Sequence, residues 1–254
     1  MAMQMASILS CFIRKWVLVF ANVRKIGGLK RSFFVTIGIF ANMNEKTIPT
    51  IAHKAHPWHG IELGPNCPDE LRVFIEIVPT DTVKYEVDKV SGYLSLDRPQ
   101  KFSNIVPSLY GFIPRSYCGS RMAGLTNEAI ARYDVKGDGD PLDICVLTEK
   151  DVTHGDIIVK CIPIGGIRLL DHDQADDKII AVLKDDAVYG HITDIEQLPM
   201  EISRRLVHYF TTYKDIPGDS KKRMNFISLY NAKVAKDVIK ASLEDYNELM
   251  KGKL

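Results

Sequence analysis

The 254-residue chain is 46% hydrophobic and carries 33 basic and 32 acidic residues, which leaves a net charge of +1. A chain of this length can bury the core of one domain with an extension. Because the charges balance, the composition argues against a protein that binds nucleic acid or a membrane surface through its overall charge.

The first 42 residues are expected to be an extension outside a folded domain that spans 43–254. Residues 1–44 contain six basic residues and no acidic one, a composition typical of a transit-type peptide. Their apolar stretches are shorter than about 10 residues, whereas a membrane span needs roughly 20. We favour Met43 as the start of a cytoplasmic protein over an organellar transit peptide, and N-terminal sequencing of the mature protein distinguishes the two.

Short β-strands are predicted from Leu71 onward. Residues 71–78 form an apolar run, and in 83–88 apolar and charged residues alternate. A side-chain period of two places Lys84 and Glu86 on the face opposite the apolar set, which in an isolated strand is more often simply solvated. Further strands are predicted at 92–96, 142–147, 156–164 and 178–183. The stretch 114–136 has no clear period and is predicted to be a long surface loop.

Three carboxylates, Asp138, Asp140 and Asp143, are crowded into one turn with a glycine and a proline. An EF-hand calcium loop fails at its fifth and sixth positions, which are Leu142 and Asp143. The DxDx(T/V) phosphatase nucleophile motif also fails at Leu142. Two interpretations remain open for the turn alone: an acidic surface turn without a ligand, or carboxylates that converge on hard divalent cations such as magnesium.

A second acidic cluster, Asp171 to Lys178, supplies four more carboxylates and a lysine between two predicted strands. Neither His172 nor His191 is spaced as a zinc ligand with a cysteine. The two clusters together favour an oxygen-rich site for several cations with basic residues nearby. Such a site implies a highly anionic substrate such as a phosphate.

Helices are predicted near the C-terminus. Residues 193–196, Thr-Asp-Ile-Glu, have the spacing of a capping box, and apolar residues recur at helical spacing from Pro199 to Tyr213. A second helix is predicted over 232–250. Short strands followed by terminal helices indicate an α+β domain, a small closed sheet flanked by helices.

The five cysteines, Cys11, Cys67, Cys118, Cys145 and Cys161, form no CxxC pair and no regular framework. An odd number in a chain this long favours reduced thiols in a reducing compartment such as the cytoplasm. Cys145 and Cys161 lie in apolar runs and are predicted to be core residues.

From about Leu71 to Met250 the chain resembles the family I soluble inorganic pyrophosphatases. The resemblance rests on motifs that occur in the order of the family: Ile75-Glu76-Ile77, Lys84-Tyr85-Glu86, Asp97-Arg98, Pro107 to Gly111 with Tyr110, the D-x-D-P-x-D turn at 138–143, Asp171 to Lys178, and Tyr213-Lys214. It implies an α+β fold with a small closed five-stranded antiparallel, OB-like β-barrel flanked by C-terminal helices.

The resemblance also implies a reaction: pyrophosphate is hydrolysed to two orthophosphates by direct attack of a metal-activated water. Several Mg²⁺ ions per active site and no covalent enzyme intermediate are implied. Members of the family assemble as dimers or hexamers, so a homo-oligomer is expected, with pyrophosphate as the partner and no nucleic acid or membrane.

Site residues are implied in the same way. Asp138, Asp143 and Asp176 would bind the principal metal, with Asp143 bridging to a second ion. Glu86, Asp171 and Asp176 would serve ions that arrive with substrate, and Asp140 would accept a proton from the attacking water. The residues expected to hold the phosphoryl groups are Lys84, Arg98, Tyr110, Lys178, Tyr213 and Lys214. Glu76 would complete the acidic wall.

The sequence departs from the family pattern in places. Val106 stands where many members have a tyrosine, and 27 residues separate Tyr110 from Asp138, more than in short bacterial members. This insertion is expected to cover either the site or an interface. A catalytically silent calcium- or phosphate-binding relative should have lost Asp140 or Arg98, and both are present. A nucleotide or phosphomonoester hydrolase would need a base-stacking pocket or a nucleophile motif, and the sequence shows neither.

Overall fold

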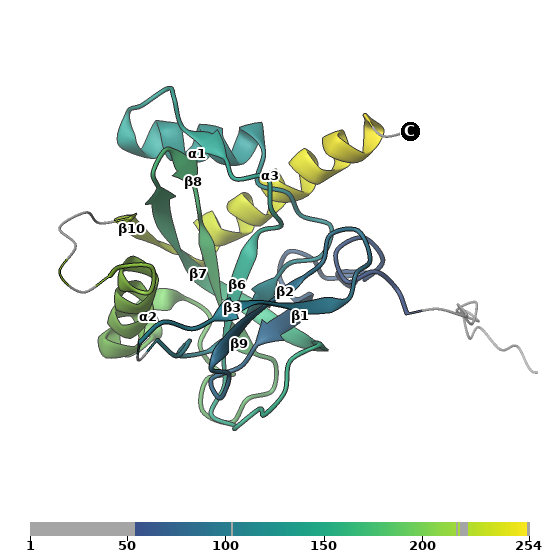
Figure 1. The fold of residues 1–254 in the computed structure, drawn as a ribbon, viewed down its shortest axis with the longest axis vertical. Coiled ribbons are helices and arrows are strands. Elements are labelled where there is room, and N and C mark those ends of the chain that lie inside the picture. The colour runs from purple at the N-terminus through teal and green to yellow at the C-terminus, as the bar shows by residue number, and fades with distance from the viewer. Residues whose placement is uncertain (1–53, 103, 217, 219–222, 253–254) are drawn as a thin grey trace, which may run out of the picture. The chain divides into compact units, whose positions relative to one another are not determined.

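The computed structural model describes residues 54–252 except 103, 217 and 219–222. Residues 1–42 lie outside these ranges, so the expectations about them stay predictions. No helix among the described residues is long and apolar enough to cross a membrane. The elements, shown in Figure 1, are β1 (Leu71–Ile77), β2 (Val83–Val87), β3 (Leu94–Pro99), β4 (Leu109–Phe112), α1 (Ser120–Ile130), β5 (Lys136–Gly137), β6 (Asp143–Leu147), β7 (Ile157–Asp171), β8 (Gln174–Ala175), β9 (Lys178–Leu183), the 3₁₀ helix η2 (Ile195–Gln197), α2 (Met200–Thr212), β10 (Met224–Asn231) and α3 (Ala232–Lys251).

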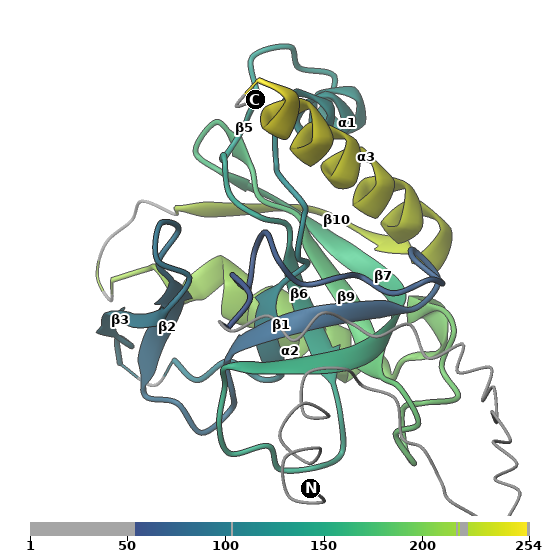
Figure 2. The same cartoon turned by 90° about the vertical axis from the view of Figure 1, so that its right-hand side faces the viewer.

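Five strands close into a ring in the order β1, β4, β6, β9 and β7, with β7 pairing back to β1. This confirms the predicted closed sheet flanked by helices (Figure 2). Four of the five pairings are antiparallel, whereas β6 and β9 run parallel, which departs from the all-antiparallel ring expected. The parallel register sets Asp143 directly opposite Lys178 at the start of both strands.

The strand β7 is much longer than the predicted strand at 156–164. It pairs with β1 through Ile157–Cys161 and with β10 through Gly165–Asp171. A register shift between Pro163 and Gly165 lets it leave the ring without ending. Proline and glycine usually interrupt strands, so the sequence pattern ended this strand too early. Its far end delivers Asp171 to the second acidic cluster.

The other strand predictions differ in accuracy. Strands β1, β2, β6 and β9 confirm the predicted ones, and β3 begins two residues later than expected, at Leu94. Lys84 and Glu86 do share one face of β2, since their charged atoms lie 2.8 Å apart. Strands β4 and β10, and the two-residue strands β5 and β8, were not predicted from the sequence.

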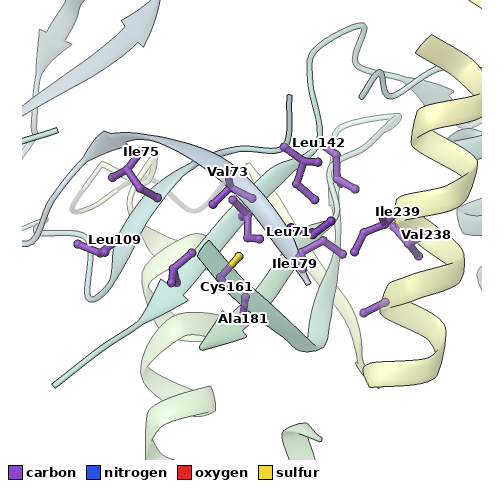
Figure 3. Packing of buried hydrophobic residues seen from close by; sticks show 14 of the residues in the cluster. Leu71, Val73, Ile75, Leu109, Leu142, Cys161, Ile179, Ala181, Val238 and Ile239 are labelled. Carbon is purple, nitrogen blue, oxygen red and sulfur yellow. The ribbon is translucent and has the colours of Figure 1, made fainter. Parts of the chain in front are cut away.

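The larger hydrophobic core takes side chains from all five ring strands and from α3 (Figure 3). Its members include Leu71, Val73, Ile75, Leu109, Ile144, Cys161, Ile179, Ala181, Val238 and Ile239. A second core joins the opposite faces of β6, β7 and β9 to α2 through Leu206 and Phe210. Cys145 and Cys161 are fully buried, as predicted, and the four cysteines that the structure describes are all free thiols.

Helices α2 and α3 confirm the two predicted C-terminal helices. The predicted capping box is shifted by one residue, because Asp194 and not Thr193 is the N-cap, and Gln197 closes the box around the 3₁₀ helix. The second oxygen of Asp194 accepts a hydrogen bond from Ala232 N at 3.0 Å, which ties this turn to the start of α3. That long-range bond explains the choice of Asp194.

The predicted surface loop at 114–136 is wrong, because it contains α1 with Met122, Ala123 and Thr126 buried. Its N-cap, Gly119, has no side chain to bond the first amides of the helix. The buried carboxylate of Asp245 in α3 accepts them instead, from Gly119 N at 3.0 Å, Arg121 N at 3.1 Å and Met122 N at 3.2 Å. A capping group 126 residues away leaves no local signal in the sequence.

Replacing Asp245 with Asn should destabilise α1, because the charge that faces three amides and Arg121 is lost. We expect the free energy of unfolding to fall by about 1 kcal/mol, because an amide oxygen still accepts hydrogen bonds but bonds to a charged group are stronger. Chemical denaturation measures the loss, and hydrogen exchange should rise at 119–123. The neighbouring Glu244 is the control: its ion pair with Arg121 is exposed, so Glu244→Gln should cost less than about 0.5 kcal/mol. Equal effects of the two changes would contradict the capping role.

Candidate active site

The aspartate turn at 138–143 joins β5 to β6 and is fixed by its own backbone. Gly139 has a φ of +79°, a conformation that glycine adopts without steric cost. Asp140 N donates to the Asp138 carboxylate at 3.0 Å, and Cys118 N donates to the carbonyl of Asp140 at 2.8 Å. The turn is therefore held against the chain that leads into α1.

The second acidic cluster meets this turn. In the parallel β6–β9 pair Asp143 lies opposite Lys178, and the Lys178 ammonium donates to Asp143 Oδ2 and, at 2.5 Å, to Asp176 Oδ1. The structure thus brings together the two segments whose meeting the sequence analysis required.

A pocket of about 230 Å³ opens where these segments meet. Its lining includes twelve of the thirteen residues singled out from the sequence: Glu76, Lys84, Glu86, Tyr110, Asp138, Asp140, Asp143, Asp171, Asp176, Lys178, Tyr213 and Lys214. The lining residues that the sequence analysis did not select are Trp58, Val87, Lys89, Phe112, Pro141 and Gln174.

Arg98 is the residue that the pocket lining does not include. It lies on β3, 39% exposed, and its Nη1 atom pairs with Asp97 at 2.5 Å. Asp97 also pairs with Lys84 at 3.1 Å. Arg98 is therefore linked to the pocket through Asp97 and Lys84, and it would have to turn to reach a substrate there.

Each lysine of the pocket is paired with a carboxylate. Lys84 contacts Glu86 at 2.8 Å, Lys214 contacts Asp171 at 2.5 Å, Lys178 contacts Asp143 and Asp176, and Lys89 contacts Asp140. The four lysines therefore offset only part of the charge of the seven acidic residues that line the pocket. An anion that recruits the lysines would leave the carboxylates to other cations.

Two tyrosines from different elements complete this wall. Tyr110 on β4 donates its hydroxyl to Asp143 Oδ2 at 2.6 Å. Tyr213 follows the last turn of α2, where its ring stacks on Tyr209 at 5.3 Å between centroids. Both tyrosines line the charged pocket, and a phenol hydroxyl can donate a hydrogen bond to an oxyanion.

Burial and mutual repulsion disfavour charge on several carboxylates. Burial, with the charges of Asp176 and Asp143, raises the pKa of Asp138 to about 7. Burial likewise raises the pKa of Asp143 and takes that of Glu76 to about 8. For Asp171, Lys214 and His172 outweigh burial and lower the pKa. A cation placed among the buried acids would relieve this cost.

The donor chemistry of the pocket fits a hard divalent cation. Within the part of the chain that the structure describes, no three His, Cys, Asp or Glu side chains are grouped closely enough to hold a metal ion as they stand. Lys178 lies between Asp143 and Asp176 and keeps them apart. The acids lining the pocket nevertheless offer only oxygen, the ligand that Mg²⁺ prefers, and the buried ones need a counter-charge.

Lys89 is the functional candidate that the sequence analysis missed. It is the second residue after the end of β2, it lines the pocket, and its ammonium contacts Asp140 Oδ1. The sequence offered one indication of this role: Lys89 comes five residues after Lys84, in the segment that turns back toward β3. A lysine next to a strand end is usually a solvated residue, so only the contact with Asp140 distinguishes it.

The two departures from the family pattern have separate places in the structure. Val106 is 1% exposed and belongs to the buried apolar residues. The insertion at 111–137 forms the end of β4, α1 and β5, and α1 packs against α3. Its chain between β4 and α1 supports the aspartate turn from behind through Cys118.

Comparison with known proteins gives a consistent result. Residues 73–247 match the family model described as inorganic pyrophosphatase. An inorganic pyrophosphatase of Chlamydia trachomatis serovar L2 is 49% identical over 199 residues, which is 77% of this chain and 95% of that protein. The soluble inorganic pyrophosphatase PPA1 of Solanum tuberosum is 37% identical over 68% of this chain and 74% of its own length.

Solved structures agree with these sequence matches. The crystal structure of inorganic pyrophosphatase from Thermus thermophilus superposes with a TM-score of 0.63 at 26% identity and covers 76% of this chain and 99% of that one. The structure of the Anaplasma phagocytophilum enzyme, titled an inorganic phosphatase, gives a TM-score of 0.61 at 29% identity over 74% of this chain and 99% of that one.

Mg²⁺ binding should depend on pH through Asp138. Because its pKa is about 7 in the folded protein, the carboxyl is protonated at pH 6 and must lose a proton to bind a cation. Titration calorimetry in buffers of different ionisation enthalpy should show at least about one proton released per protein at pH 6 and fewer as the pH rises.

The raised pKa of Asp138 also predicts how the stability of the metal-free protein changes with pH. The folded Asp138 carboxyl holds its proton more tightly than the unfolded one, so its contribution to stability should fall as pH rises from about 4 to about 7, and the difference between wild type and Asp138→Asn isolates that contribution. Thermal melts across this range measure the fall. A pH-independent Mg²⁺ affinity together with flat thermal melts would contradict the raised pKa.

Proposed function

The chain belongs to the inorganic pyrophosphatase family, and we propose that it hydrolyses pyrophosphate to two orthophosphates by direct attack of water, with several Mg²⁺ ions and without a covalent enzyme intermediate. One observation carries the proposal. Carboxylates and lysines from β2, the aspartate turn, the 171–178 segment and the end of α2 line one small pocket in alternating ion pairs.

Asp138, Asp143 and Asp176 would hold the principal ion, with Asp143 shared with a second ion and Glu86 and Asp171 serving further ions. The ions when bound would lower the pKa of a water and neutralise charge on the phosphoryl oxygens. The chain itself supplies an oxygen-lined recess for them, in which Asp143, Asp176 and Glu76 are each 25% exposed or less.

Asp140 is the proposed general base. It lies in the middle of the aspartate turn, its carboxylate is 45% exposed, and its backbone is fixed on both sides by hydrogen bonds. Water can therefore reach it, whereas Asp143 is enclosed by Tyr110 and Lys178. A carboxylate that meets the pocket water and is rigidly mounted is suited to take a proton from the attacking water.

Lys84, Lys178 and Lys214 are proposed to bind the two phosphoryl groups, together with Arg98, Tyr110 and Tyr213. The lysines would exchange their carboxylate partners for phosphoryl oxygens, and phosphate neutralisation rather than covalent help is what this reaction needs. Arg98 can contact an oxyanion with two parallel hydrogen bonds, and the lysines act as movable point charges.

The pocket suits a small anion better than a nucleotide. Trp58 lines it, but its indole is 6% exposed, stacked on His59 and bonded through Nε1 to the carbonyl of Ser116. It therefore offers no free face for a base. The whole set of implied site residues is present, Asp140 and Arg98 included, which disfavours a silent binding protein.

The proposal extends to the setting of the enzyme. We propose residues 43–254 as the pyrophosphatase domain of a cytoplasmic homo-oligomer, in line with the free thiols and with the assemblies that the family implies. Light scattering of the purified protein and N-terminal sequencing of the native one measure these two points.

Substrate choice is the first test. Orthophosphate release from pyrophosphate, ATP and a phosphomonoester should be compared with Mg²⁺ and with Ca²⁺. We expect rapid release from pyrophosphate with Mg²⁺ and turnover at least about 100-fold slower on the other two substrates, because a phosphomonoester fills only half of the phosphoryl cradle and Trp58 offers no free face for the base of ATP. Comparable rates on ATP would overturn the assignment of pyrophosphate as substrate, and Ca²⁺-bound protein without turnover under any condition would indicate a silent relative.

Replacing Asp140 with Asn tests the base. The amide keeps the size of the side chain but accepts no proton, so kcat should fall by about 10²- to 10⁴-fold while Mg²⁺ binding and melting temperature stay close to wild type. Asp173→Asn is the matched control, because Asp173 belongs to the second cluster, is 71% exposed and is absent from the pocket lining. Near-normal turnover of Asp140→Asn would refute the assigned base.

A further inference from the structure

Asp177 lies between two proposed site residues but faces away from them. In the extended chain entering β9, Asp176 and Lys178 line the pocket, and the alternation of side chains turns Asp177 to the opposite side. There it is 2% exposed. The proposed function gives this buried carboxylate no task.

Its partner is Arg168 on β7, which is itself 7% exposed. Arg168 Nε lies 3.3 Å from both carboxylate oxygens and Nη2 lies 3.2 Å from Oδ2, so the planar guanidinium meets the carboxylate with two nitrogens. Such a contact fixes orientation as well as distance. It couples the peptide at 177 to the long central strand.

Two further elements, α1 and β10, enclose this pair. Arg168 Nη1 donates to the carbonyl of Leu125 in α1 at 3.3 Å, and the Tyr230 ring of β10 lies 5.3 Å from the guanidinium carbon. Tyr230 can approach because residue 166 is glycine: a Cβ there would lie 2.3 Å from the ring. The pair is thus held from α1, β7 and β10 at once.

Stability alone does not account for a buried ion pair here. Removing two charges from water costs several kcal/mol per ion, and apolar residues of similar volume often give equal or greater stability. The pair also fixes the orientation of the backbone at residue 177. Both neighbours then project into the pocket, where Lys178 reaches Asp176 at 2.5 Å and also contacts Asp143.

We propose that Arg168 and Asp177 are positioning residues for the metal and phosphate site, which hold Asp176 and Lys178 in register with Asp143. The inference rests on the proposed function for the roles of Asp176 and Lys178. Loss of the pair should weaken Mg²⁺ binding and raise KM more than it lowers kcat, because Asp140 is held separately by the aspartate turn and Cys118.

The test compares four variants with wild type. Asp177→Asn and Arg168→Met each leave one buried partner alone, and Arg168→Lys keeps the charge without the planar fork. The double variant Arg168→Met/Asp177→Leu removes both charges and so leaves no unpaired charge in the core. The control is Val238→Ala in α3, a cavity variant whose side chain lies in the larger core and outside the pocket lining. It matches the loss of stability without touching the pair.

Mg²⁺ affinity is measured by calorimetry without pyrophosphate, beside KM, kcat and melting temperature. We expect the double variant to fold and to bind Mg²⁺ about 10-fold more weakly, with a similar rise in KM, as for other outer partners of metal ligands. Arg168→Lys should recover part of the loss, and Val238→Ala should lower the melting temperature alone.

Wild-type Mg²⁺ affinity and KM in the folded double variant would overturn the inference and leave the pair a structural one. If the wild-type protein releases no orthophosphate from pyrophosphate, the proposed function fails, whereas the Mg²⁺ titrations still report on the pair. The two failures are therefore distinguishable.

Discussion

The site depends on one interaction, the pairing of carboxylates with lysines in a buried recess. Lys178 contacts Asp143 and Asp176 at once, and it is 3% exposed. Charges in such a place are strongly coupled, because little water screens them. A change in one ion pair of the pocket therefore alters the others. A polyanion that binds the lysines would free the carboxylates for cations, and cations that bind the carboxylates would free the lysines for the polyanion.

The fold is arranged to allow this pairing. Without the parallel β6–β9 pair, Asp143 and Lys178 would not begin neighbouring strands. Two parallel strands need a connection that returns the chain to the same end of the sheet, and β7 and β8 form it. Asp171 is the last residue of β7, and Asp176 lies between β8 and β9. The acidic clusters that are 28 residues apart in the sequence, at Asp143 and Asp171, thus meet through strand order rather than through a local motif.

Local patterns predicted a good part of the molecule. Alternation in 83–88 gave β2 with Lys84 and Glu86 on one face, and helical periodicity gave α2 and α3. The patterns failed where a distant residue decides the conformation. Helix α1 is capped by Asp245, the 3₁₀ turn bonds Ala232 through Asp194, and β7 runs through a proline and two glycines because β10 continues the pairing. For the site, the ordered motifs predicted most residues that line the pocket. The roles of Lys89 and of the Arg168–Asp177 pair became visible only in the structure.

The capping of α1 by Asp245 also connects the C-terminal helix α3 to the aspartate turn. The carboxylate lies within the last ten residues of the chain, yet the segment it grips, Gly119 to Met122, adjoins Cys118, whose amide supports the carbonyl of Asp140. The aspartate turn is therefore finished only once the C-terminal helix has docked. Because α3 follows every ring strand in chain order, the nascent chain would complete these strands before the aspartate turn acquires a rigid backing.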